Sequence, residues 1–245
     1  AGATNGYAAP GNVAGEISFL RSAGFTGMDD VGSHPARQAI EFAVANRLVD
    51  GYSDRKFRPD QALRRSELAQ YLGMGASIRQ SLPLDGSSSF GDLSVSSPAY
   101  AYAEAAIAKG APLRDLGWNQ DGVMRLVNGA FKPSGSVSRS DLAYALVQAQ
   151  GLQDDARAFS GEMTAFFNGQ RVPVKDADQV PADLRGYAQL ALDTGVLNAR
   201  FGIEQGPFDL QPKVVAYFDP KQSVTRAAYA VAAGRFLTQF QTAED

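Results

Sequence analysis

The sequence predicts a mainly all-α fold of three helix–loop–helix units, with room for short β-hairpins in the loops. The main observation is a motif, Phe-x-Pro followed after five residues by Arg, that recurs with the same internal spacing. Its copies are Phe57-Arg58-Pro59 with Arg65, Phe131-Lys132-Pro133 with Arg139, and Phe218-Asp219-Pro220 with Arg226. A second observation is that a helix-forming run follows each arginine. Repetition of this kind indicates units that bury their apolar faces against one another.

An amphipathic helix is expected upstream of each motif copy, after an apolar-x-Asp step. These steps are Met28-Asp29-Asp30, Phe90-Gly91-Asp92 and Val174-Lys175-Asp176. Apolar residues then recur at helical spacing. In the first unit they are Ala36, Ile40, Val44 and Leu48. Each expected helix ends near a glycine, and the motif proline fixes the backbone ahead of the second helix.

The units differ in the length of the segment between the aspartate and the motif. Insertions lengthen this segment in the second and third units, whereas it is short in the first. The inserted segments 113–129 and 198–217 alternate apolar and turn-forming residues, so any β-hairpins are expected there. The domain boundaries that follow are 28–82, 88–152 and 172–240 for the three units, after an N-terminal linker or extension at 1–27.

The N-terminal segment has the character of a linker or a processed terminus. Its first eleven residues, AGATNGYAAPG, combine small residues with Gly and Pro. Two explanations for a chain that begins at Ala1 are open: removal of a signal peptide, or origin as a fragment of a longer protein. The apolar stretch 16–24 is expected to pack on the helical units or to close an upstream domain.

The composition limits the classes of function that the chain can have. Hydrophobic residues make up 44% of its 245 residues, as is typical of folded proteins. The formal net charge is −3 and both signs are dispersed, so the basic face that nucleic-acid binding needs is missing. The chain contains no cysteine, which excludes disulfides and thiolate sites. No apolar run approaches the ~20 residues of a membrane span, so a soluble protein is expected.

Catalysis by this chain is not expected. His34 is the only histidine, so a Ser-His-Asp site would have to use it, yet no nucleophile motif accompanies it. The glycines are scattered and form no phosphate-binding loop. Asp54 and the Asp154-Asp155 pair lack the spacing of a calcium loop. We therefore expect a non-enzymatic chain with no metal and no cofactor, and any catalytic domain would lie outside it.

Residues 28–72 resemble the S-layer homology (SLH) repeat. They follow the family order of an apolar-x-Asp-Val start, a GYxDGxFxP-like loop and a second helix that begins near an arginine and a glutamate. The resemblance is looser over 90–150, and over 174–237 it rests on the Phe-x-Pro motif. It implies a pseudo-threefold trimer with grooves between its arms. It also implies non-covalent anchoring to an anionic secondary cell-wall polysaccharide, which often ends in a pyruvylated sugar.

Three arginines are candidate ligand-binding residues because each lies at the start of a second helix. In the second unit, Ser138 and Asp141 form a predicted capping box around Arg139. Arg139 then lies at the positive end of the helix dipole, where a guanidinium can bind a carboxylate through two hydrogen bonds. Arg65 and Arg226 occupy the matching positions. Alternatively, each arginine could pair with the aspartate of its own unit and only stabilise the fold; these aspartates are Asp30, Asp92 and Asp176.

Tyr52 and Trp118 complete the candidate ligand-binding set. Trp118, the sole tryptophan, lies in the insertion of the second unit, where it could stack on a sugar ring or anchor the loop by partial burial. The remaining motif residues are expected to have structural roles. They are Asp30, Asp92, Asp176, Phe57, Pro59, Phe131, Pro133, Phe218 and Pro220.

Several positions depart from the family pattern and leave two functions open. Pro35 stands where the family has an aromatic residue, Arg55 replaces a glycine, and Ala228 replaces the acidic residue of the third unit. One hypothesis is an extracellular cell-wall anchor, a monomeric pseudo-trimer that can be part of a larger protein and whose partner is cell-wall polysaccharide. The other is a degenerate SLH-like trimer that acts as a protein-interaction or stabilising domain of a larger secreted enzyme.

Overall fold

The computed structural model of the protein describes residues 27–75, 78–205 and 210–241, so nearly all of the expected N-terminal linker lies outside the described residues. The α-helices are α2 (Arg37–Ala45), α3 (Arg65–Gly75), α4 (Tyr100–Ile107), α5 (Arg139–Ala149), α6 (Gln153–Ala158), α7 (Arg185–Asp193) and α8 (Arg226–Gln241). Two 3₁₀ turns, η2 (Ala177–Gln179) and η3 (Ala182–Leu184), precede α7. The strands form two hairpins, β1 (Thr164–Phe167) with β2 (Gln170–Pro173) and β3 (Arg200–Glu204) with β4 (Lys213–Tyr217).

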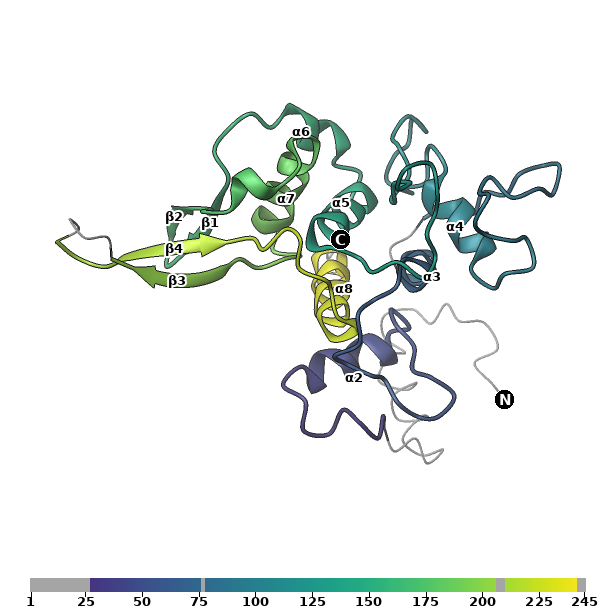
Figure 1. Ribbon diagram of the computed structural model, residues 1–245, viewed down its shortest axis with the longest axis horizontal. Coiled ribbons are helices and arrows are strands. Elements are labelled where there is room, and N and C mark those ends of the chain that lie inside the picture. The colour runs from purple at the N-terminus through teal and green to yellow at the C-terminus, as the bar shows by residue number, and fades with distance from the viewer. Residues whose placement is uncertain (1–26, 76–77, 206–209, 242–245) are drawn as a thin grey trace.

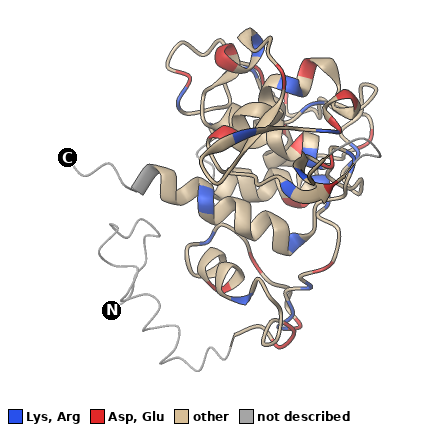
Figure 2. Cartoon of the chain, turned by 90° about the vertical axis from the view of Figure 1, so that its left-hand side faces the viewer, with Lys and Arg blue, Asp and Glu red and all other residues tan. Residues whose placement is uncertain are grey.

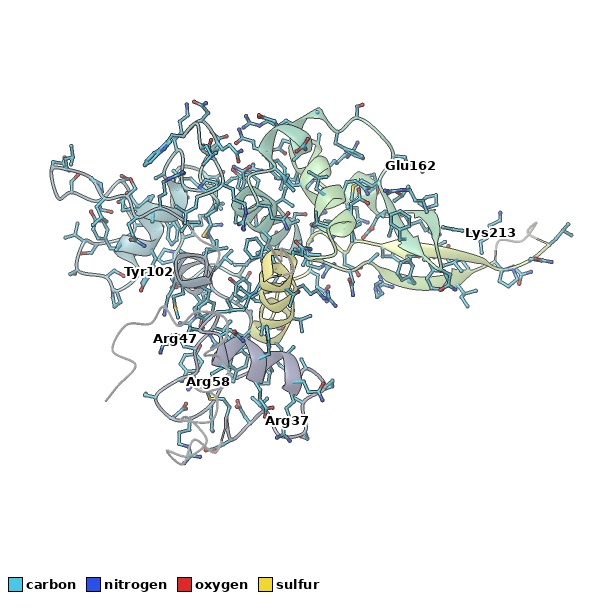
Figure 3. All side chains as sticks on the ribbon, turned by 180° about the vertical axis from the view of Figure 1, so that it is seen from behind. Arg37, Arg47, Arg58, Tyr102, Glu162 and Lys213 are labelled. Carbon is cyan, nitrogen blue, oxygen red and sulfur yellow. The ribbon has the colours of Figure 1, made fainter. Side chains whose placement is uncertain are left out.

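Six of the helices pack as three pairs, each with one inner and one outer helix. α3, α5 and α8 lie nearer the centre of the molecule, and α2, α4 and α7 lie around them (Figure 1). α3 packs against α4, α5 against α7, and α8 against α2. The contact between α3 and α4 needs Gly73, because a Cβ there would fall 2.7 Å from the ring of Tyr102, which lies beside α3 (Figure 3). Because α8 returns to α2, the first and last helices of the described residues are tied together.

A ring of backbone hydrogen bonds joins the segments that lead into the three central helices. Leu63 N–H donates to Val224 O, Val137 N–H to Leu63 O and Val224 N–H to Val137 O, at 2.8, 3.0 and 2.8 Å. All three side chains are buried. The first N–H groups of a helix have no partner within the helix, and here they bond to a neighbouring loop. Arg65 N–H, for example, donates to Gly135 O.

Each Phe-x-Pro loop is closed by the aspartate that precedes it. The two carboxylate oxygens accept hydrogen bonds from the N–H groups of the motif phenylalanine and of the residue after it. Asp30 binds Phe57 and Arg58, Asp92 binds Phe131 and Lys132, and Asp176 binds Phe218 and Asp219, at 2.7–3.0 Å. The residue after each phenylalanine has a positive φ, an unfavourable conformation that these charge-assisted bonds stabilise.

The prediction of a mainly all-α fold is wrong, because the structure is mixed α/β with two antiparallel hairpins. The β1–β2 hairpin turns at Asn168 and Gly169, whose φ angles are +47° and +80°. Asn-Gly between two apolar runs is a strong signal for a two-residue hairpin turn. This hairpin was not predicted, because its segment lies between two copies of the helical motif.

The β3–β4 hairpin forms inside the segment 198–217, where a hairpin was expected. Its register runs from Arg200 opposite Tyr217 to Glu204 opposite Lys213. The two hairpins contact each other, with the rings of Phe167 and Phe201 4.9 Å apart, and extend from the helices as an arm (Figure 1). Lys213 lies on this arm (Figure 3). The other inserted segment, 113–129, forms turns and an isolated bridge.

Charged residues of both signs are interspersed over the molecule (Figure 2). Among the helices of residues 27–75, 78–205 and 210–241, none combines the length and the apolar character needed to cross a membrane. The domain boundaries at 28–82, 88–152 and 172–240 stay predictions.

We expect Asp176→Asn to lower the free energy of unfolding by about 2 kcal/mol, because an amide offers one acceptor oxygen where two N–H groups each need one. Asp176 is buried, 7% exposed, so water cannot replace the lost bond easily. Asp178→Asn is the matched control, because Asp178 lies two residues further along the chain and its side chain is exposed. Urea unfolding at neutral pH measures both variants, and equal stability of Asp176→Asn and the wild type would contradict this role of the carboxylate.

The same contact predicts a pH dependence at Asp92. Hydrogen bonds from the N–H groups of Lys132 and Phe131 hold the pKa of Asp92 below its ordinary value of 3.8. A lowered folded-state pKa gives stability that is present above 3.8 and is lost as the pH falls through the folded-state pKa. The stability difference between the wild type and Asp92→Asn should therefore be constant near neutral pH and shrink in strong acid. Urea unfolding at a series of pH values tests this, and a difference that grows in acid would contradict it.

Candidate functional site

The three motif arginines each bind the backbone of another Phe-x-Pro loop. The Nε group donates to the carbonyl of the motif phenylalanine, and Nη2 donates to a carbonyl earlier in the same loop. Arg65 binds Phe131 O and Arg125 O, Arg139 binds Phe218 O and Asn198 O, and Arg226 binds Phe57 O and Asp50 O, at 2.5–2.9 Å. Each guanidinium also lies 4.8–5.4 Å from the ring centre of that phenylalanine.

These contacts differ from the Arg–Asp pairing considered from sequence. Asp30, Asp92 and Asp176 accept backbone N–H groups of their own loop, as described above. The arginine of the same unit reaches the loop of the following unit instead. Sequence spacing within one unit could not indicate this, because the partners are up to 176 residues apart.

Arg226 is fully enclosed by side chains of this chain. Its Nη1 donates to Glu67 Oε1 at 2.6 Å and to the Tyr71 hydroxyl at 2.8 Å, and only 2% of the residue is exposed. The Tyr52 ring centre lies 4.6 Å from the guanidinium, and the Tyr52 hydroxyl donates to the same Glu67 oxygen. Burial and the bond to Glu67 raise the pKa of Tyr52, so its hydroxyl stays a neutral donor. We call Arg226, Glu67, Tyr71 and Tyr52 the closed arginine cluster.

Arg65 is also buried, 4% exposed, but its environment is less complete. Within the described parts of the chain no partner for its Nη1 is found. Burial lowers the pKa of Arg65, and the charges of Asp141 and Asp92 oppose this shift. The nearby carboxylates thus act on Arg65 through space, whereas Glu67 binds Arg226 directly.

Arg139 is the most open of the three. It is partly exposed, and its Nη1 likewise has no partner within residues 27–75, 78–205 and 210–241. Burial lowers the pKa of Arg139, Asp219 and Asp176 oppose the shift, and the neighbouring cation Arg235 lowers the pKa further. Asp219 is itself bound through both oxygens by Arg200, at 2.8 and 2.9 Å. The positive charge of Arg235 thus acts on Arg139 through space.

One position explains the difference between the three arginines. Two residues after the helix-starting arginine, the chain has Glu67 in α3, Asp141 in α5 and Ala228 in α8. Glu67 reaches Arg226. Asp141 is one methylene shorter, and it binds Ser138 in the predicted capping box, which the structure confirms. Ala228, the equivalent residue for Arg139, is exposed and brings no carboxylate.

The other candidate ligand-binding residues lie in different surroundings. Tyr52 belongs to the closed arginine cluster, and Arg58 lies 4.0 Å from its ring centre. Trp118 is 62% exposed and lies over Arg79, whose guanidinium is 4.2 Å from the ring centre. Arg79 in turn donates to carbonyls of the surrounding loop, among them Gly110 O and Asp115 O. Trp118 therefore has both features considered from sequence, a loop contact and an exposed ring.

Sequence analysis did not identify Glu67, Tyr71 or Arg235 as parts of these sites. Glu67 offered a signal, because it stands where Asp141 stands in the capping box. Arg235 offered none, since it lies further along α8 and outside the motif. His34 has a local role: its Nδ1 accepts the Ala36 N–H at 3.0 Å. The part of the chain that the structure describes contains no group of His, Cys, Asp and Glu able to hold a metal.

We expect Arg226→Met to lower the free energy of unfolding by about 3–5 kcal/mol, as when one partner of a buried ion pair is removed. The double variant Arg226→Met with Glu67→Gln should recover part of this loss, since Glu67 then leaves no unpaired charge. Arg37→Met is the control, because it breaks the exposed Arg37–Glu41 pair and should cost about 0.5 kcal/mol or less. Urea unfolding measures all three, and similar losses for Arg226→Met and Arg37→Met would refute the closed cluster.

The comparisons with known proteins bear on the first Phe-x-Pro loop. No curated protein matches the chain. The segment that contains Asp30, the Phe57–Pro59 loop and Arg65 does match a family, and the other two loops lie outside the match. Residues 27–69 match the S-layer homology domain, a family of non-catalytic cell-wall anchoring modules that bind secondary cell-wall polymer.

Proposed function

We propose that this chain is a non-catalytic cell-envelope anchor built from three SLH-type repeats, at 28–82, 88–152 and 172–240. The family match over 27–69 supports the first repeat. The recurrence of the same contacts supports the other two: an aspartate closing a Phe-x-Pro loop, an arginine binding the next loop, and the backbone ring of Leu63, Val137 and Val224. These observations support the proposal of a monomeric pseudo-trimer.

The proposed ligand is an anionic secondary cell-wall polysaccharide, held non-covalently at the cell surface. The observation that carries this proposal is the environment of Arg139, a partly desolvated guanidinium with an unused Nη1 next to a second cation, Arg235. A carboxylate or a pyruvylated sugar would supply the missing acceptor. Charge-assisted bonds to a guanidinium already fixed by two carbonyls are short and strong.

The three arginines are proposed to contribute unequally. Arg226 already binds Glu67, so the chain itself provides the carboxylate that a ligand would bring. Arg65 has a free Nη1 but is buried, with Asp141 nearby. Arg139 is partly exposed, and Ala228 leaves no carboxylate at the position that Glu67 occupies opposite Arg226. We therefore assign the main anion contact to Arg139, a secondary contact to Arg65, and a structural role to Arg226 and Tyr52.

Co-sedimentation with cell-wall sacculi from the source organism tests the anchor. The chain should sediment with intact sacculi and stay in solution after the secondary polymer has been extracted from them. Sedimentation with neither preparation would contradict the anchor. That result would favour a protein-interaction or stabilising domain, for which the hairpin arm, with Phe166 and Ile203 exposed by 56% and 76%, offers a surface.

A single substitution should close the Arg139 site without touching Arg139. In Ala228→Glu, the new carboxylate occupies the position relative to Arg139 that Glu67 occupies relative to Arg226. The new side chain should therefore pair with Arg139 and lower the affinity for the polymer about tenfold or more. Ala228→Gln is the control of equal size without the charge and should bind nearly as the wild type does. Equal affinities for Ala228→Glu and Ala228→Gln would argue against an anion contact at Arg139. Urea unfolding shows that both variants are folded.

A further inference from the structure

A cavity of about 340 Å³ lies between α5, α6, α7 and the loop that precedes α5. Six side chains with polar groups line it: Asp121, Arg125, Tyr144, Arg157, Asp183 and Tyr187. None of the three motif arginines is among its lining residues. Its size falls within the range of sites that hold small molecules or sugar units.

The formal charges of the side chains that line this pocket sum to zero. Arg125 pairs with Asp183 at 2.9 Å, and Arg157 pairs with Asp121 at 2.5 Å, so two cations face two anions. All four side chains are about half exposed. Arg157 also bonds to the Tyr187 hydroxyl, and the other N–H donors and carboxylate acceptors are open to a bound molecule. Neither sign of charge dominates.

Two tyrosines form the inner wall of the pocket. The rings of Tyr144 and Tyr187 lie 4.8 Å apart at 53°, and Arg125 lies 5.7 Å from the centre of the Tyr144 ring. Burial raises the pKa of both tyrosines, so their hydroxyls stay neutral. The Tyr144 hydroxyl donates to Gly122 O at 2.9 Å, a buried bond that fixes the position of the ring.

The wall contributed by α6 is held in place by close packing. A Cβ at Gly186 of α7 would fall 1.8 Å from the Ala156 carbonyl oxygen, so α6 can approach α7 this closely only over a glycine. α6 lies outside the Phe-x-Pro motifs. The pocket is therefore a feature of the connection between the second and third units and is not repeated with the motif.

We propose that this pocket binds a neutral saccharide unit, as a second site besides the arginine contacts. Sugar hydroxyls donate and accept at once, and alternating guanidinium and carboxylate groups satisfy both functions. Tyr144 and Tyr187, 6% and 3% exposed, close the floor of the pocket beneath these charged groups. An anionic ligand would meet two carboxylates here, whereas at Arg139 it would meet cations. The inference rests on the proposed function only in that a cell-wall polymer would supply such units.

Titration with neutral tetrasaccharides, followed by two-dimensional NMR of the amide groups, tests the pocket. The probes are the β-1,4-linked tetramers of glucose and of N-acetylglucosamine and the α-1,4-linked tetramer of glucose. Binding of at least one probe should shift the amide signals of Tyr144, Gly186 and Tyr187. Ala182→Phe, which places a ring at the pocket lining, should abolish these shifts. Ala158→Phe is the matched control, because Ala158 is exposed on α6 and does not line the pocket.

A second pair of variants tests the polar contacts. Arg125→Ala should weaken saccharide binding about tenfold, because it removes charge-assisted donors. Arg171→Ala should leave it unchanged, since Arg171 has the same kind of surroundings elsewhere, an Asp193 pair at 3.0 Å and the Phe166 ring at 4.3 Å. Absence of shifts with all three probes, or shifts that persist in Ala182→Phe, would overturn the proposal. These titrations use no wall polymer. Failure of the saccharide proposal is therefore distinguishable from failure of the anchor proposal, which the sacculus binding of Ala228→Glu tests.

Discussion

The bond from each helix-starting arginine to the carbonyl of the next Phe-x-Pro loop is the contact on which the other contacts depend. The motif phenylalanine is fully buried in all three copies, so its carbonyl oxygen needs a donor from within the protein. The guanidinium supplies it while stacking on the same ring. Because each arginine serves a different loop, the contacts run around the circle of helices. Arg226 closes the circle across 169 residues, so no unit completes its own loop.

This arrangement connects stability with binding. An arginine that binds two carbonyls through Nε and Nη2 has a fixed orientation, and its Nη1 points to a fixed place before any ligand arrives. Affinity improves when a group is ordered in advance, because less conformational entropy is lost on binding. Partial burial adds to this effect, since a desolvated guanidinium gains more from a carboxylate than an exposed one does. Under the proposed function, the residue that holds the fold is therefore also the one that would hold the anion.

Local parts of this architecture could be predicted from the sequence, and contacts between distant segments could not. The equal spacing of Phe57, Phe131 and Phe218 from their arginines indicated the repeated loop, and the capping box at Ser138 was confirmed. The aspartates were found, but their partners are backbone N–H groups, which carry no residue identity to recognise. The arginine partners lie in other units, beyond any spacing rule. The β1–β2 hairpin was not predicted, although Asn168-Gly169 is a typical signal for a hairpin turn. The flanking motifs have helical periodicity, and this favoured a helical interpretation of the whole region.

The divergence of the three copies follows from the same physics. Because backbone carbonyls already hold each arginine, the residue two positions further on is free to change without loss of the loop. Glutamate reaches the partner arginine and closes the site, aspartate is too short and caps its own helix, and alanine leaves the guanidinium open. Burying a guanidinium without a carboxylate has a cost, and that cost decreases with exposure. Arg139, for which the equivalent position holds Ala228, is accordingly more exposed than Arg226, which Glu67 pairs.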